Sequence, residues 1–165
     1  MRRSGISVLL SVLPLLTACV YGFAGGGLPS HIRTVAILPF DNETSASTLQ
    51  RELYDQMRRD LENRLGLRDA AENRADAIVR GRITRYEPDI PIAYSANPAQ
   101  STSAERKLQM TVDVEIIDQK TGHTLWSQKG MTADGTYAEG AEVSGRRQAV
   151  EKIVNNIVTG AQSQW

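Results

Sequence analysis

The strongest constraint on the fold of this 165-residue chain is a strict alternation of apolar and polar side chains between positions 108 and 116. Successive side chains of a β-strand point to opposite faces, so this alternation predicts a strand with one buried and one solvated face. A sheet built on this strand needs cover on one side only. The apolar residues are Leu108, Met110, Val112, Val114 and Ile116, and they alternate with Gln109, Thr111, Asp113, Glu115 and Ile117.

Three further segments are predicted to be strands. Residues 34–40 (TVAILPF) form an apolar run, and residues 124–132, which contain Trp126, follow a turn at 119–122. Residues 77–86 alternate, which predicts a half-buried strand. In that strand Ala77, Val79, Gly81 and Ile83 are expected to face one side, and Arg80, Arg82, Thr84 and Tyr86 the other.

Two segments repeat apolar residues at helical spacing. The first follows a turn-rich stretch at 41–47 and ends at Gly66, with Ser47 and Gln50 placed as a capping box. The second is expected to close at Trp165. Their apolar positions are Leu49, Leu53, Met57, Leu61 and Leu65 in the first, and Ala149, Val150, Ile153, Val154, Ile157, Val158 and Ala161 in the second.

The element order β-α-β-β-β-α predicts an α/β (α+β) two-layer sandwich, with a mixed sheet of about four strands and both helices on one face. The opposite face would carry Arg80 and Arg82 on one strand and Asp113 and Glu115 on the next. Opposite charges on neighbouring strands attract by ~0.2–1 kcal/mol per pair. Such a face is either simply solvated or a polar contact surface, and the sequence leaves both interpretations open.

The N-terminal segment has the pattern of a lipoprotein signal peptide. Arg2 and Arg3 precede an apolar stretch at 6–16, which as a helix would rise only roughly 16 Å, well short of the ~30 Å hydrocarbon core. The sequence Leu-Thr-Ala before Cys19 fits the lipobox, after which Cys19 becomes a lipidated N-terminus. The alternative is an ordinary signal peptide with a stray free thiol.

These features divide the chain into a signal peptide at 1–18, a lipidated Cys19 with a glycine-rich linker at 19–30, and a single domain at 31–165. No second apolar run of ~18 residues follows. Two or three acyl chains on one cysteine hold a domain at a bilayer. Because Val20 rather than aspartate follows the cysteine, we expect a lipid-anchored protein on the periplasmic side of the outer membrane.

Composition argues against several other functions. The chain has 19 basic and 19 acidic residues spread along it, so the basic footprint of a nucleic-acid-binding protein is missing. His31 and His123 lie in no recognisable catalytic or metal motif, and a single cysteine supports neither a disulfide nor a zinc cage. We therefore expect a non-enzyme with no catalytic residues, no metal and no cofactor beyond the covalent lipid on Cys19. A hydrolase would need a titratable cluster converging in a pocket.

Several segments together resemble the LptE family of lipopolysaccharide-assembly lipoproteins. They are residues 19–23, 25–27, 28–37, 40–42 and 75–84. The resemblance implies a two-layer α/β lipoprotein of the outer membrane that sits as a plug inside the β-barrel LptD. It also implies that the chain helps that barrel fold and binds lipopolysaccharide. A barrel lumen is polar, which suits a plug with a charged sheet face.

Three basic residues are candidates for contact with lipopolysaccharide under this resemblance. Lys129 lies near the place where a family member would carry a basic lipid-contacting residue, and Arg106 and Lys107 border the long loop after Tyr86. A basic residue on a strand or loop is also commonly a solvated charge. The alternative function is a general periplasmic lipoprotein adaptor for another envelope complex, which needs no barrel partner.

Overall fold

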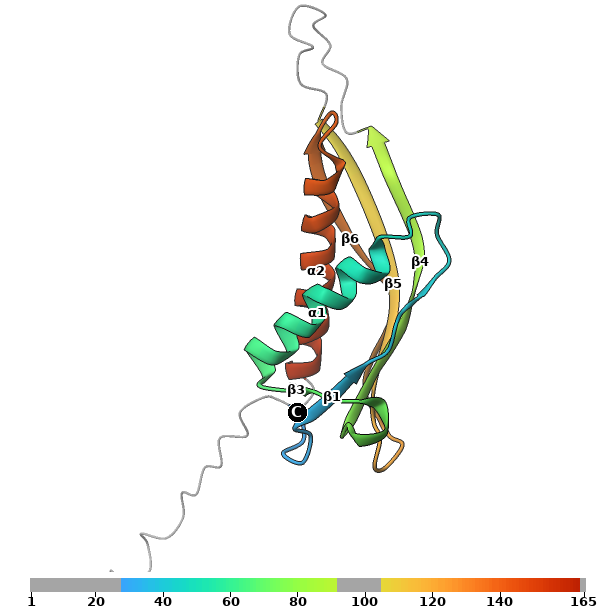
Figure 1. The fold of residues 1–165 in the computed structure, drawn as a ribbon. Helices are drawn as coiled ribbons and strands as arrows, with labels where there is room; N and C mark the ends of the chain where they lie inside the picture. Colours follow the sequence, from blue (N-terminus) through green and yellow to red (C-terminus); the bar gives the residue numbers. More distant parts are fainter. Residues whose placement is uncertain (1–27, 92–104, 164–165) are drawn as a thin grey trace, which may run out of the picture.

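The structure, a computed structural model, describes residues 28–91 and 105–163. It confirms a mixed α+β fold in which two helices cover one face of a sheet (Figure 1). The expected count of about four strands and the expected order β-α-β-β-β-α are both wrong, because the described part of the sheet has six strands, two of them short additions on either side of the first helix. The elements are β1 (Thr34–Ile37), β2 (Asp41–Asn42), α1 (Leu49–Leu65), β3 (Arg68–Asp69), the 3₁₀ turn η2 (Glu72–Arg74), β4 (Ala77–Pro91), β5 (Glu105–Asp118), β6 (Thr124–Ala138) and α2 (Glu142–Ser163).

The strand order is β3-β1-β4-β5-β6, and β2 continues the line of β1 along β4. β1 pairs in parallel with β3 and β4, whereas β4, β5 and β6 form an antiparallel meander. The two strands missed from sequence, β2 and β3, have two residues each. A segment this short shows no alternation, so only pairing with a neighbour defines it.

Helix α1 buries the predicted stripe and ends as expected at Gly66, whose φ of 65° is left-handed. The Gly66 N–H donates to the carbonyl of Glu62 at 3.1 Å. The expected capping box is wrong, because the residue before the helix is Thr48 and its side chain makes no capping hydrogen bond. Gln50 instead donates from Nε2 to the carbonyl of Phe40 at 2.5 Å, which ties the helix to the loop that precedes it.

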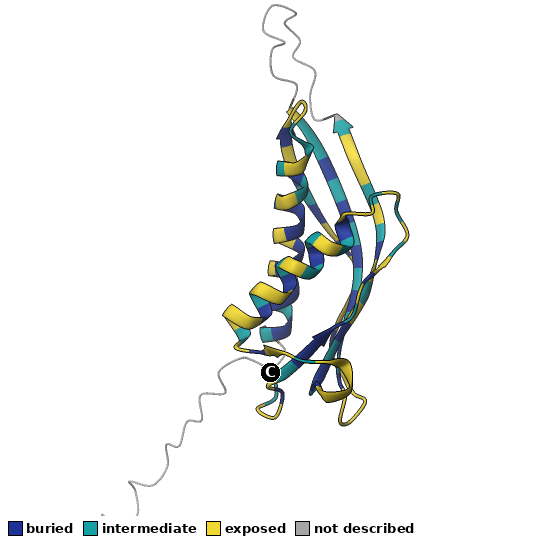
Figure 2. Cartoon of the chain, in the orientation of Figure 1, coloured by how far each residue is buried: buried dark blue, intermediate teal, exposed yellow. Residues whose placement is uncertain are grey.

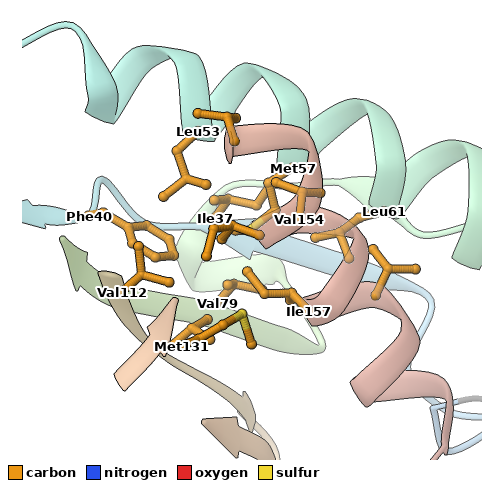
Figure 3. Close-up of a cluster of buried hydrophobic side chains, with 14 of the residues drawn as sticks. Ile37, Phe40, Leu53, Met57, Leu61, Val79, Val112, Met131, Val154 and Ile157 are labelled. Carbon is orange, nitrogen blue, oxygen red and sulfur yellow. The ribbon is translucent and has the colours of Figure 1, made fainter. Parts of the chain in front are cut away.

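One hydrophobic core fills the space between the sheet and the helices. The dark-blue faces of both helices in Figure 2 point toward the sheet. In Figure 3, Met57 of α1 and Ile157 of α2 lie over Val79 of β4 and Val112 of β5. The predicted inward side of β5 is confirmed, since Leu108, Met110, Val112, Val114 and Ile116 are all buried.

Strand β4 changes face at a bulge. Ile83 pairs with Val112 and Arg85 with Thr111, so Thr84 is an extra residue with no opposing residue in the β4–β5 register. The insertion turns Tyr86 toward the helices, where it packs against the core and its hydroxyl donates to Glu142 Oε1 at 2.6 Å. The prediction that Tyr86 shares the polar face with Arg80 is therefore wrong.

Candidate functional site

On the described sheet face opposite the helices, two ion pairs join β4 to β5, and we call them the charge ladder: Arg80 with Glu115, and Arg82 with Asp113. Each pair joins β4 to β5 at directly opposed positions. Arg80 Nη2 lies 3.0 Å from Glu115 Oε2, and Arg82 Nε lies 3.0 Å from Asp113 Oδ2. The cross-strand pairing expected from sequence is confirmed.

Both carboxylates of the charge ladder also accept hydrogen bonds from β6. The Gly130 N–H donates to Asp113 Oδ1 at 2.8 Å, and Thr124 Oγ1 donates to Glu115 Oε1 at 2.7 Å. The Gly130 amide, helped by Arg82, lowers the pKa of Asp113, and the Thr124 hydroxyl, helped by Arg80, lowers that of Glu115. Both carboxylates of the charge ladder are therefore stabilised in the ionised form and held in place by these hydrogen bonds.

A shallow hollow of about 550 Å³ lies over the charge ladder. The backbone at Gly81 and the apolar residues Leu38, Pro39 and Val114 contribute to it, and Lys129 lines it from β6. Lys129 and Gly130 of β6 both lie opposite the single residue Asp113 of β5, and this arrangement is a β-bulge. Gly130 in the bulge has a φ of 63°. Lys129 is exposed and contributes to the lowered pKa of Asp113.

The other two basic candidates lie at the far end of the sheet and face carboxylates. Arg106 Nη1 lies 2.5 Å from Asp89 Oδ2, and its Nη2 lies 3.2 Å from Glu139 Oε1. Lys107 Nζ lies 2.7 Å from Asp134 Oδ2. Arg106 and Lys107 are consecutive on β5, so their side chains leave the sheet on opposite faces, Arg106 on the side of buried Tyr137 and Lys107 on the side of exposed Thr136.

Lys129 lies away from that end of the sheet. Lys107 is opposite Thr136 on β6, seven residues along the strand from Lys129, a separation of roughly 20 Å at the usual strand rise. The three candidates therefore do not form one cluster. Residue Cys19, the expected site of lipidation, lies outside the described residues.

Sequence reasoning missed a buried carboxylate at the opposite end of the sheet. Asp118 is 2% exposed, and its Oδ2 lies 2.9 Å from His31 Nε2. Its Oδ1 accepts the N–H groups of Lys120 and Thr121 in the β5–β6 turn. Burial alone would raise the pKa of Asp118, but the hydrogen bonds from His31 and the turn lower it to about 2.

A signal for this site was present in the sequence. Asp118 continues the even-numbered, inward positions of β5 and is followed at once by a turn, where a carboxylate commonly caps backbone N–H groups. His31, expected to be a surface histidine without a role, is half-exposed. Its bond to Asp118 links the segment before β1 to the end of β5. His123 is exposed, as expected.

A second cluster joins three elements behind the sheet. Arg146 of α2 donates to Glu52 of α1 at 2.8 Å and to Glu142 at 3.3 Å, and Glu142 accepts the hydroxyl of Tyr86. Burial and the bond to Glu142 raise the pKa of Tyr86, while Glu52 raises that of Arg146. The ion pairs of Arg146 with Glu52 and Glu142 stabilise the contact between α1 and α2. Across the described ranges, no set of three His, Cys, Asp or Glu side chains is arranged to hold a metal ion.

The fold and the helix-free face define a two-layer α+β domain with a charged sheet face. More specifically, the chain belongs to the LptE family, because the family model described as lipopolysaccharide-assembly matches residues 32–159. No curated protein sequence matches the chain. Among residues 28–91 and 105–163, neither helix is both long and apolar enough to cross a bilayer.

Solved structures share the fold at low sequence identity. A point variant of PelC, a dodecamer from Paraburkholderia phytofirmans, is 18% identical, with 86% of this chain and 94% of that chain covered and a TM-score of 0.52. A putative lipoprotein from Caulobacter crescentus is 16% identical, with 76% and 87% covered and a TM-score of 0.50. A hypothetical protein from Chlamydia trachomatis is 13% identical, with 78% and 97% covered and a TM-score of 0.52. At these identities the likeness concerns the fold alone.

Proposed function

We propose that this LptE-family protein is an outer-membrane lipoprotein that acts as plug and folding partner of an LptD-type β-barrel and binds lipopolysaccharide. The family match over residues 32–159 indicates that the protein takes part in lipopolysaccharide assembly. The observation that carries the finer proposal is the charge ladder on the helix-free face, since a barrel lumen presents a polar wall to its plug.

Ion pairing within the charge ladder lowers the cost of covering this face. A charge removed from water loses its hydration, and the loss is severe when no partner compensates for it. Asp113 and Glu115 already have an arginine and a second hydrogen-bond donor, so a polar wall can cover them without new partners for each charge. The hollow above them, about 550 Å³, leaves space for side chains of that wall.

The lipid anchor belongs to the same proposal. A lipidated Cys19 would hold the domain at the periplasmic side of the outer membrane, where a barrel is assembled. The covalent lipid is then the one attached group that this function requires. Lipopolysaccharide contact is assigned first to Lys129, which lines the open hollow, and then to Arg106 and Lys107, which face carboxylates of their own chain.

The test is co-purification of the native chain from cell envelopes, combined with charge reversal of the charge ladder. Arg80→Glu with Arg82→Glu places four carboxylates together and should reduce both the barrel that co-purifies and the amount of folded barrel in the membrane. Arg58→Glu with Arg59→Glu, on the exposed side of α1, is the matched control and should change neither.

Depletion of the chain separates this proposal from the adaptor function. Loss of a plug should lower folded barrel and make the outer membrane leaky to large or apolar antibiotics. Normal barrel levels and a tight outer membrane after depletion, with another envelope protein co-purifying, would favour a general periplasmic lipoprotein adaptor.

A further inference from the structure

Strand β6 is the outermost strand of the sheet and is 15 residues long. One edge of β6 pairs with β5, and no strand from residues 28–91 or 105–163 pairs with its other edge. The N–H and C=O groups on such an edge are a template on which another strand can add. The edge therefore needs some other partner if the chain is to remain a single copy.

Helix α2 comes unusually close to this strand. A methyl group added to Gly135 of β6 would lie 1.8 Å from the carbonyl oxygen of Gly145 on α2, so only glycine fits at this crossing. The helix runs back along β6 after a short turn (Figure 1). This proximity lets side chains one turn further along α2 reach the strand backbone.

Two α2 side chains bind the backbone of β6. The Thr136 N–H donates to Gln148 Oε1 at 3.4 Å, and Gln148 Nε2 donates to the Thr136 carbonyl at 3.2 Å. The Gln148 amide thus takes both bonds that a neighbouring strand would make with Thr136. Lys152 Nζ donates to the carbonyl of Asp134 at 2.9 Å.

The spacing of these contacts matches on the two elements. Residues 134 and 136 are two apart on a strand, about 6.7 Å, and therefore present their backbone groups to the same side. Residues 148 and 152 are four apart on a helix, about 6 Å, and share one face. Strand and helix run in opposite directions, so residue 136 meets residue 148 and residue 134 meets residue 152.

We propose that Gln148 and Lys152 close the free edge of β6 against strand addition by a second copy of this chain. The bulge at Lys129 and Gly130 interrupts the same edge lower down, where Thr132 Oγ1 donates to the Gly130 carbonyl. On the other side of the meander, Pro88 of β4 has no N–H to offer, and its carbonyl accepts the Tyr137 hydroxyl. This inference stands without the proposed function, although a plug awaiting its barrel would need the same protection.

The experiment compares the full chain, purified in detergent, with the double variant Gln148→Ala and Lys152→Ala. Loss of both side chains should convert the monomer mass seen by sedimentation equilibrium into a concentration-dependent dimer or larger species. Hydrogen exchange in peptides that cover residues 133–138 should become faster at low concentration and slower where the copies associate. Far-UV circular dichroism confirms that the variant is folded.

The matched control is Arg147→Ala with Glu151→Ala, an exposed pair with the same spacing on the adjacent face of α2. It should keep the wild-type mass and the wild-type exchange. A folded double variant of Gln148 and Lys152 that stays monomeric over the same concentrations overturns the proposal. A wild-type chain that already associates through β6 also overturns it.

Discussion

The indole ring of Trp126 on β6 lies directly against the backbone of Gly160 on α2, where a methyl group would come within 2.6 Å of the ring. Trp126 is buried beneath the helix at this point. Gly145 makes the corresponding close contact near the start of α2. Glycines at both ends of the helix therefore set its distance from the sheet, and the intervening apolar side chains pack within that distance.

This contact predicts that Gly160→Ala destabilises the domain. Alanine favours a helix over glycine by about 1 kcal/mol, but an extra methyl group in a packed contact costs about 1–3 kcal/mol. We expect a net loss of about 1 kcal/mol in urea unfolding. Thr159→Ala, at the exposed neighbouring position, should be neutral or stabilising. Equal or greater stability of Gly160→Ala would mean that the Trp126 ring moves aside without cost.

The two faces of β5 predict unequal effects at neighbouring positions. Val112 is fully buried, so Val112→Asp would bury a charge with no partner and should cost several kcal/mol, comparable to the total stability of a domain. Asp113→Ser removes an exposed ion pair and should have a much smaller effect. Urea melts of both variants provide the comparison, and equal losses would contradict a strand with one solvated face.

The sequence pattern was sufficient where alternation ran without interruption. Every face assignment in β5 is confirmed, and so is the shared polar face of Arg80, Arg82, Asp113 and Glu115, because the face follows from period two alone. Which carboxylate each arginine meets depends on the register between the two strands, and the structure supplies that register. Tyr86 was placed on the wrong face because one inserted residue, Thr84, reverses the positions that follow it, up to a second irregularity between Glu87 and Ile90. A bulge depends on the partner strand, so the strand's own sequence does not reveal it.

Polar side chains were the other source of error. Asp118 occupies an inward position that hydrophobicity alone would not assign to a carboxylate, and one of its oxygens pairs with His31, 87 residues away. Gln50 binds a carbonyl outside its helix instead of completing a capping box. Both residues also bind a segment outside their own element, and local spacing does not identify that partner.

Asp118 predicts a loss of stability in acid. Its pKa is about 2 in the folded chain, against an ordinary value of 3.8, so its carboxylate stabilises the fold above about pH 4 and ceases to do so as the pH falls through 2. Asp118→Asn should therefore be less stable than wild type at neutral pH, with a difference that shrinks between about pH 4 and pH 2. Urea melts across that range, with the exposed variant Asp55→Asn as control, test this. A difference independent of pH would contradict it.

Lys129 predicts salt-dependent binding of anionic lipid. Lys129→Ala should weaken binding of lipopolysaccharide at low salt and lose its effect at high salt, because exposed charges are screened over ~8–10 Å at physiological ionic strength. The triple variant with Arg106→Ala and Lys107→Ala should bind still less. That variant also releases carboxylates on Asp89 and Asp134, so its thermal melt is needed beside the binding curve. Lys120→Ala is the control, and wild-type binding by the triple variant would remove all three residues from the site.

Cys19 predicts the route to the membrane. Cys19→Ser should leave the precursor uncut by the lipoprotein signal peptidase and unlabelled by radioactive palmitate, because the thiol is the acceptor of the lipid. Wild-type chain expressed in parallel provides the positive control. Incorporation of palmitate into the Cys19→Ser variant would show that the anchor lies elsewhere.

The contact between His31, which precedes β1, and Asp118 has a mechanical consequence for a domain that is pulled from its N-terminal side. β1 lies between β3 and β4, and Asp76 Oδ2 accepts the N–H groups of Thr34, its first residue, and of Arg33, the residue before it. Tension along β1 must therefore shear the hydrogen bonds on both its sides together, after first drawing His31 away from Asp118. Hydrogen bonds that are sheared together resist force better than bonds that break one after another. A pull on the N-terminal side of the domain would therefore be distributed over the sheet and would not unravel the sheet from one end.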